Sequence, residues 1–518
     1  MIHSSSGRFL KGTISLLFVA VLAACKPAFF NPPRLTSSPA QLAPAAVSSS
    51  EPLFLPAPTA ASGAGSSSSP VVSAGANPTL TVWINESSDQ HRQTLQQMVD
   101  EFEQRYPINV ELYLVSSGLL PSLMETAILS DTVPDIVLHP AAYTIGWSQR
   151  GILDPAAADA IIDQIGRSSF DPAALSLVDI DGATAAIPSD GYHQLLIYRK
   201  DWFDELGLAA PTDYASMMVA AETVHDAGTL NSGIVVPTES NLITTHQVFE
   251  QIAAANGCQL IDRKGEVLIL EPACREAIDF YQRIINLYSP VGVQTDTSSR
   301  NAYLTGTTGF IIGSPRMLPK LAGLDETVTP RCPECVDNPG YLAEVSGIIT
   351  ALKGVNGGAP AASYGEVTYL GITQGADSEL TSAFVDYWFD DGYPIWLGTE
   401  PERKVPMRWG TDDVPGLFID RWGSLPVGGS DRTLTDIYGQ VLVDQLKEGI
   451  ADSQRWGFRQ GQGALIGTMY QELTLPVVLQ EMLSGYFNSG QTLNEMYRRI
   501  TDLIPDYAYY PATEPGEN

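Results

Sequence analysis

The sequence predicts an α/β protein. The main observation is a strand-helix-strand-helix-strand pattern between Pro78 and His139, which is the unit of a doubly wound parallel sheet. Further strands and helices are predicted after it, and the C-terminal third is largely helical. A chain of 518 residues is also too long for one hydrophobic core, so we expect two or three domains.

The first strand and helix of this unit are predicted from their side-chain patterns. Leu80–Ile84 is a short apolar stretch with several β-branched residues, which favour strands. From about Ser88, apolar residues recur at steps of three and four, the spacing of a helix with one buried face. Ser87, Ser88 or Asp89 can cap this helix, and Pro107 ends it.

The unit continues with a strand, a helix and a strand: Ile108–Val115, Pro121–Leu129 and Asp135–Leu138. Ligands of such sheets bind beyond the carboxyl ends of the strands, which here lie near Asn85, Glu86 and His139. No Gly-x-Gly-x-x-Gly follows the first strand, so the sequence does not predict a dinucleotide-binding loop.

The elements after this unit are predicted in the same way. Strands are expected at Gln194–Tyr198, Thr308–Ile312, Gly347–Leu352 and Val367–Ile372. Helices are expected at Tyr214–Ala227, His246–Asn256, Glu271–Leu287, Ser378–Asp390, Thr433–Ile450, Ala464–Met482 and Leu493–Leu503.

The composition excludes partners that are polyanions. Only 17% of the residues are charged, yet the net charge is −30. Such a chain repels nucleic acid and anionic lipid. Its many apolar and uncharged polar residues are typical of exported globular proteins and unlike a disordered chain.

The N-terminus predicts a lipoprotein signal peptide over residues 1–25. Arg8 and Lys11 precede an apolar run, Gly12–Ala23, which ends in Leu-Ala-Ala-Cys25. This ending resembles a bacterial lipobox, whose cysteine is lipidated, for example with palmitate. The alternative is a transmembrane anchor, but the run is well short of the roughly 20 residues that cross a bilayer. Residues 26–77 are rich in Ser, Ala and Pro and predict a disordered tether, and 506–518 is a tail.

The other four cysteines are expected to pair if the protein is exported. Cys258 and Cys274 flank a predicted hairpin at Gln259–Leu270, which would bring them together. Cys332 and Cys335 are separated by two residues, which suits a small loop-locking disulfide. A thioredoxin-like site or half of a zinc site has the same spacing, but no second Cys/His pair lies nearby.

Several pieces of the chain, in this order, carry a resemblance to a known family: Pro134–Val137, Ile187–Gly191, Leu196–Phe203, Asn256–Tyr288, Gly309–Pro315, Arg403–Arg408 and Met482–Ile504. They resemble the extracellular solute-binding proteins of bacterial ABC importers, the group that includes maltodextrin-binding proteins. The resemblance covers residues 79–505. Two segments depart from the family pattern: Thr307-Thr308 and the long region Pro415–Gly463. These departures bear on the docking surface and the ligand class more than on the fold.

The resemblance implies a two-lobed periplasmic-binding-protein-like fold, in which each lobe is a sheet flanked by helices and the ligand lies in the cleft between them. It places residues 78–190 and 347–398 in the first lobe and residues 191–346 and 399–505 in the second. Closure around a ligand would follow from population shift. The implied partners are the permease subunits of an importer, and the implied protein is a monomer without cofactor or metal.

Sugar-binding clefts need aromatic faces and polar side chains, and the candidates are drawn from strand ends and lobe crossings. They are Asn85, Glu86, His139, Asp190, Tyr192, His193, Ser314, Arg316, Glu366, Tyr369 and Trp409. Some have alternatives: Arg316 suits a surface ion pair, and Trp83 suits the core as well as the cleft. Trp388, Tyr393 and Trp396 are spaced as packing residues.

The function that this implies is a lipid-anchored extracytoplasmic receptor that binds a sugar or oligosaccharide and delivers it to an ABC importer. Alternatives are a secreted enzyme acting on carbohydrate, a receptor for a polyamine or cation, and a receptor for signalling. Catalysis has little support, because the acidic pairs Asp390-Asp391 and Asp412-Asp413 suit exposed loops better than an acid and base set across a pocket. No Gly-x-Ser-x-Gly, His-Glu-x-x-His or P-loop occurs either.

Overall fold

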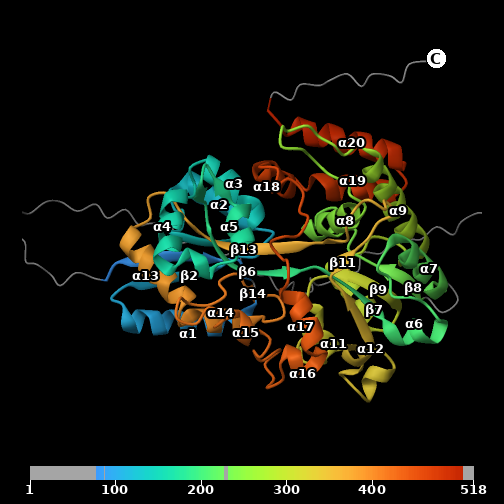
Figure 1. Cartoon of the computed structure of the whole chain (residues 1–518), viewed down its shortest axis with the longest axis horizontal. Helices are drawn as coiled ribbons and strands as arrows, with labels where there is room; N and C mark the ends of the chain where they lie inside the picture. The colour runs from blue at the N-terminus through green and yellow to red at the C-terminus, as the bar shows by residue number, and fades with distance from the viewer. Residues whose placement is uncertain (1–76, 87, 227–230, 506–518) are drawn as a thin grey trace, which may run out of the picture. The chain divides into compact units, whose positions relative to one another are not determined.

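Two sheets organise the chain in the computed structural model, which describes residues 77–505 apart from 87 and 227–230 (Figure 1). The expected signal peptide with Cys25, the tether up to residue 76, Ser87, Ala227 and the tail 506–518 lie outside the described residues. The larger sheet has the strand order β14-β6-β13-β3-β1-β2, and the smaller has the order β10-β7-β9-β8.

The larger sheet forms the first lobe. Its strands are β1 (Thr79–Ile84), β2 (Asn109–Leu114), β3 (Ile136–Pro140), β6 (Ile187–His193), β13 (Gly365–Ile372) and β14 (Val405–Pro406). Strands β2 and β3 run parallel to β1. Strand β13 is antiparallel to β3 and β6, and β14 is antiparallel to β6. The sheet is therefore mixed, and the prediction of a parallel sheet is correct only for its first three strands.

The helices of the first lobe cover both faces of this sheet. They are α1 (Asp89–Arg105), α2 (Leu120–Ser130), α3 (Ala141–Gln149), α4 (Pro155–Ile165), α5 (Pro172–Leu177), α13 (Ser378–Phe389) and α14 (Gly392–Thr399). Ser88 caps α1 by accepting a hydrogen bond from the His91 amide, as predicted. Figure 1 shows α13 and α14 beside α1, although they are far apart in the sequence.

The smaller sheet forms the second lobe. Its strands are β7 (Leu195–Arg199), β8 (Ser232–Val235), β9 (Thr308–Gly313) and β10 (Ser346–Ile349). Around it lie α6 (Lys200–Leu206), α7 (Tyr214–Val224), α8 (Ile243–Ala255), α9 (Pro272–Tyr288), α10 (Asp296–Leu304), α11 (Met317–Leu321) and α12 (Tyr341–Val345). Disulfides join Cys258 to Cys274 and Cys332 to Cys335 in this lobe. The expected hairpin between the first pair is reduced to one bridge, Ile261–Val267.

The chain passes between the lobes at short segments. One residue, Gln194, separates β6 of the first sheet from β7 of the second. The return runs from β10 through the small ladder of β11 (Ala351–Leu352) and β12 (Ala362–Ser363) to β13. All of strand β10 except Ser346 lies inside the range 347–398 expected in the first lobe, yet the strand pairs with β7 of the second. In the range 399–505 expected in the second lobe, β14 joins the first sheet.

The C-terminal helices are α15 (Ile419–Trp422), α16 (Leu434–Tyr438), α17 (Gln440–Lys447), α18 (Gly463–Gln471), α19 (Thr474–Leu483) and α20 (Ser489–Asp502). Two longer predicted helices are wrong, because each is interrupted. Gly439, with φ of 80°, separates α16 from α17. Leu473 adopts the left-handed conformation before α19, and Pro476 has no N–H with which to continue α18. Helix α18 packs against α3 of the first lobe (Figure 1).

Candidate functional site

A cavity of about 560 Å³ takes its lining from both lobes. The first lobe contributes Asn85, Pro140, Tyr143, Tyr192, Glu366 and Thr368, among others. The second lobe contributes Gln247, Asp296, Arg300, Ser314, Arg316 and Lys320, among others. Because β13 runs antiparallel to β3 and β6, its first residues lie at the edge where those strands end. This is the edge at which α/β sheets bind ligands.

Five of the predicted candidates line this cavity: Asn85, Tyr192, Ser314, Arg316 and Glu366. Tyr192 and Glu366 are directly paired on β6 and β13. The Arg403 guanidinium lies 4.6 Å from the centre of the Tyr192 ring, so this aromatic side chain is held by a cation–π contact. A Cβ at Gly191 would lie 2.7 Å from the Glu366 carbonyl oxygen, so a glycine lets the two strands approach.

Asp190 does not line the cavity, although it neighbours Tyr192 closely in the sequence. A register shift opposite Ser189 interrupts the β6–β13 ladder, and Asp190 is buried. Its Oδ2 accepts hydrogen bonds from Trp396 Nε1 at 2.7 Å and from Ser189 Oγ at 2.8 Å. Burial raises the pKa of Asp190, although the charge of Lys404 and these hydrogen bonds oppose the change.

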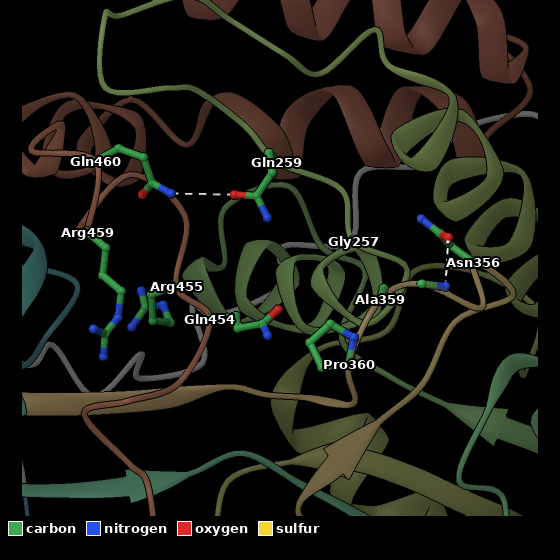
Figure 2. A pocket seen from close by; sticks show the side chains of 10 residues that line it. Gly257, Gln259, Asn356, Ala359, Pro360, Gln454, Arg455, Arg459 and Gln460 are labelled. Atoms are coloured by element: carbon green, nitrogen blue, oxygen red, sulfur yellow. Dashed lines mark hydrogen bonds between the residues drawn. The ribbon is translucent and has the colours of Figure 1, made fainter.

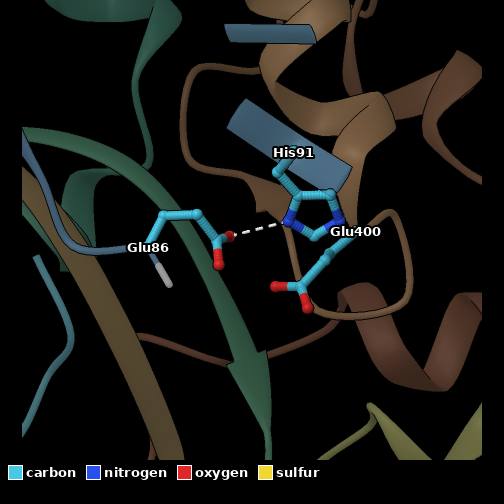
Figure 3. A group of neighbouring side chains, drawn as sticks. All are labelled: Glu86, His91 and Glu400. Carbon is cyan, nitrogen blue, oxygen red and sulfur yellow. Dashed lines mark hydrogen bonds and ion pairs between the residues drawn. The ribbon is translucent and has the colours of Figure 1, made fainter. Parts of the chain in front are cut away.

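Glu86 also turns away from the cavity and belongs to what we call the Arg316 cluster: Glu86, His91, Arg316, Glu400 and Lys404. Glu86 Oε2 lies 2.9 Å from His91 Nδ1 (Figure 3). It also lies 3.9 Å from Lys404 Nζ. Burial favours a raised pKa for Glu86, but the His91 hydrogen bond and the Lys404 charge outweigh it and hold the pKa well below its usual range.

The Arg316 cluster has a spacing that a metal ion could bridge, but its carboxylates already have cationic partners. Ligand atoms of Glu86, His91 and Glu400 lie within 4.8 Å of one another (Figure 3). Arg316 Nε and Nη2 donate to the two oxygens of Glu400 at 2.7 and 2.8 Å. Arg316 follows β9 of the second lobe, whereas Glu400 follows α14 of the first. We therefore infer that the cluster serves to join the two lobes.

The two predicted histidines are buried among the protein's own groups. His139 Nδ1 donates to the Pro140 carbonyl at 3.0 Å, and the ring packs against Trp147. Burial lowers the pKa of His139 to about 4. His193 Nε2 donates to the Glu448 carbonyl at 2.6 Å, and burial lowers its pKa as well.

Tyr369 and Trp409 lie elsewhere. Tyr369 is buried on β13, and its hydroxyl donates to the Ala174 carbonyl at 2.8 Å. Trp409 lines a separate hollow together with Arg167 and Phe170.

Several cavity residues were not among the sequence candidates: Tyr143, Gln194, Gln247, Arg300, Arg403 and Tyr470. Tyr143 follows closely after β3, so the rule that placed candidates at strand ends would have reached it. Arg403 lies in the Arg403–Arg408 piece that resembles the family. Arg300 and Tyr470 lie on helices α10 and α18, and no local signal sets them apart from other helix residues.

A second group of charges, which we call the Arg455 network, lies beside the cavity. Arg455 bonds Glu250 Oε1 at 3.0 Å and Glu366 Oε2 at 3.1 Å, and it donates to the Tyr470 hydroxyl at 2.7 Å. The Tyr364 hydroxyl also donates to Glu366 Oε2, at 3.1 Å. Glu250 is on α8 of the second lobe and Glu366 on β13 of the first, so the network joins the lobes.

Arg455 also borders a smaller polar cavity of about 440 Å³ (Figure 2). Its lining includes Gln454, Arg459 and Gln460, and Gln460 Nε2 lies 3.5 Å from Gln259 Oε1 (Figure 2). This cavity has no aromatic side chain in its lining among the residues described. The cavity of about 560 Å³, with tyrosines and residues of both lobes, is therefore the candidate site.

Two sheet-based lobes with short crossings and a cavity between them define the class of two-lobed ligand-binding proteins. The model of the family described as bacterial extracellular solute-binding protein matches residues 87–334. This match covers just under half of the chain, which is similar to the family over those residues. It is 23% identical over 443 residues to YcjN of Escherichia coli strain K12, which is named as a periplasmic-binding protein of an ABC transporter; the match covers 82% of this chain and 93% of YcjN.

Solved structures agree with the fold. A sugar transporter protein from Arthrobacter chlorophenolicus A6, with bound laminaribiose, has a TM-score of 0.64 at 15% identity, over 82% of this chain and 99% of its own. An ABC transporter solute-binding protein from Thermotoga lettingae TMO, with bound α-D-tagatose, has a TM-score of 0.63 at 17% identity, over the same shares. The predicted two-lobed α/β fold is confirmed.

Among the residues that the structure describes, none of the helices combines the length and the apolar character needed to cross a bilayer.

Proposed function

We propose that this protein is a receptor that binds a sugar or polyol in the cavity between its lobes and delivers it to an ABC importer without transforming it. The observation that carries the proposal is the lining of the cavity. Tyr143 and Tyr192 offer aromatic faces, and Asn85, Gln247 and Ser314 offer polar groups, the combination that sugars require. The similar structures with bound laminaribiose and tagatose support the same ligand class.

Binding without reaction is also consistent with where the carboxylates lie. The acidic pairs at 390–391 and 412–413 do not line the cavity, and its acidic residues are Asp296 and Glu366. Glu366 Oε2 already accepts hydrogen bonds from Arg455 and Tyr364.

The N-terminal part of the proposal is that Cys25 carries a lipid that anchors the receptor outside the cytoplasm. Its support is the lipobox-like ending of the apolar run together with a family described as extracellular. The partners at the membrane would be the permease subunits of the importer. Labelled palmitate should enter the wild-type protein but not Cys25→Ser, and equal labelling would refute the anchor.

The test of the binding site is calorimetry with the purified full-length protein against mono- and disaccharides and polyols. We expect one or more to bind saturably, and Tyr192→Ala to weaken that binding at least tenfold. Trp409→Ala is the matched aromatic control, because Trp409 lines a different hollow, and it should leave the affinity unchanged. Chromatography of the same mixtures should show no new saccharide. A new product, or equal effects of the two variants, would contradict the proposal.

A further inference from the structure

The charges in the cavity differ from those of the whole chain. The net charge of the chain is −30. Yet four basic side chains line the cavity, Arg300, Arg316, Lys320 and Arg403, against two acidic ones, Asp296 and Glu366. The question is which of these charges are free to contact a ligand.

Three of the basic side chains already have an acidic partner. Arg316 pairs with both oxygens of Glu400, and Arg403 lies 3.8 Å from the same carboxylate. Lys320 pairs with Asp325. Arg316 and Lys320 are therefore largely neutralised by groups of the protein itself, and Arg403 shares the carboxylate of Glu400 with Arg316.

Arg300 is different. Its Nε is buried and has no hydrogen-bond partner among the described residues, and it forms no ion pair within 4 Å there. Asp296, one helical turn earlier on α10, lies near enough for the Arg300 charge to oppose the raised pKa that burial gives this acid. However, Asp296 accepts its hydrogen bond from Thr244, at 2.7 Å. Arg300 thus lines the cavity with a guanidinium whose Nε donor is unused.

Glu366, on the first lobe, lacks a hydrogen-bond donor to one of its two carboxylate oxygens. Its side chain is 4% exposed, and Oε2 takes the contacts from Arg455 and Tyr364. Oε1 is buried and has no hydrogen-bond partner in the described part of the chain. A buried acceptor without a donor costs about 1–3 kcal/mol or more if it is charged, so a ligand hydroxyl that donates to Oε1 would be stabilised there.

From this pair we infer that the receptor selects a sugar that bears a carboxylate, such as a uronic or aldonic acid. The hydroxyls of the ligand donate to Glu366 Oε1, and its carboxylate accepts from Arg300, whose fork of donors matches a carboxylate. A single unpaired guanidinium balances a monoanion better than a phosphate dianion, and Asp296 and Glu366 add negative charge nearby. The inference rests on the proposed function and narrows its ligand class.

The test compares matched ligands by calorimetry at pH 7 on the purified full-length protein. The pairs are glucuronate with glucose, galacturonate with galactose, and gluconate with glucitol. We expect the acid of at least one pair to bind ten or more times more tightly than its neutral partner. Arg300→Met should remove that preference, whereas Arg300→Lys should keep part of it. Arg459→Met, in the smaller polar cavity, should change neither affinity.

The outcomes separate the inference from the function on which it rests. If the neutral sugar binds as tightly as its acid in every pair, or if glucose 6-phosphate binds more tightly than glucuronate, the inference is overturned and the proposed receptor function still holds. An acid preference that survives Arg300→Met would overturn the role of Arg300. Failure of all these compounds to bind would overturn the inference together with the sugar receptor. Circular dichroism and thermal unfolding of each variant confirm that it is folded.

Discussion

The Arg455 network and the Arg316 cluster both join the lobes, and they differ in their access to water. The Arg455 side chain is 4% exposed, and Glu250 and Glu366 are equally buried. The Arg316 side chain is 43% exposed, although its Glu400 partner is largely covered. Charges in the first group have little access to solvent, whereas Arg316 can exchange its partner for water.

This difference in exposure indicates which contact between the lobes breaks when the lobes move. Separating the Arg455 network would leave buried charges without partners. This costs far more free energy than breaking a partly hydrated ion pair. We therefore expect the Arg455 network to stay intact as a fixed point. We expect the Arg316–Glu400 pair, at the cavity, to be the contact that opens and closes.

The largest effect is expected from Arg455→Met. The substitution leaves Glu250 and Glu366 buried without their cation, and removing one partner of a buried ion pair costs about 3–5 kcal/mol. Urea denaturation should show a loss of this size in the free energy of unfolding. Arg459→Met is the control, because Arg459 pairs with Asp452 at the exposed surface and should cost at most about 1 kcal/mol. Equal losses in the two variants would refute the distinction between buried and hydrated pairs.

His139 extends the comparison to a buried titratable group that has no counter-charge beside it among the described residues. Burial lowers the pKa of His139 from 6.5 to about 4. Between these pH values the unfolded chain binds a proton that the folded chain does not, so stability falls as the pH drops from 6.5 to 4. The loss from this residue is roughly 3 kcal/mol, complete once the pH is below both values.

His139→Gln should remove this part of the pH dependence, because glutamine does not titrate and still offers a donor to the Pro140 carbonyl. The free energy of unfolding, measured from pH 7 to pH 4 for both proteins, should converge as the pH falls. Parallel curves would show that His139 is protonated in the folded state.

The first unit could be predicted because its signals are local. Thr79–Ile84, the helix after Ser88 and the strand from Ile136 all follow from side-chain spacing and a cap. The interruptions at Gly439 and Leu473 could not be predicted in this way, since the apolar spacing continues across them and only the backbone conformation changes.

The sequence could predict that the site lies at the strand ends, but not which side chains there face the cavity. Asn85 lines the cavity but the adjacent Glu86 turns into the Arg316 cluster, and no local pattern distinguishes the two. Asp190 and Tyr192 lie two residues apart on one strand, yet Asp190 bonds Trp396 and only Tyr192 lines the cavity. Arg455 lies 89 positions from Glu366 in the sequence, so that pairing follows from tertiary packing.

The smallest effect is expected at the Arg316–Glu400 pair. Arg316→Gln should cost about 1 kcal/mol or less in the free energy of unfolding, because Arg316 is hydrated and because Arg403 and Lys404 remain near Glu400. A double-mutant cycle with Glu400→Gln isolates the coupling of the pair. The matched control is Arg150–Glu125, a similar two-contact pair that lies within the first lobe. If the Arg316–Glu400 pair opens with the lobes, its coupling should shrink at high salt as that of the control does. A coupling of several kcal/mol that salt does not change would instead make this pair as fixed as the Arg455 network.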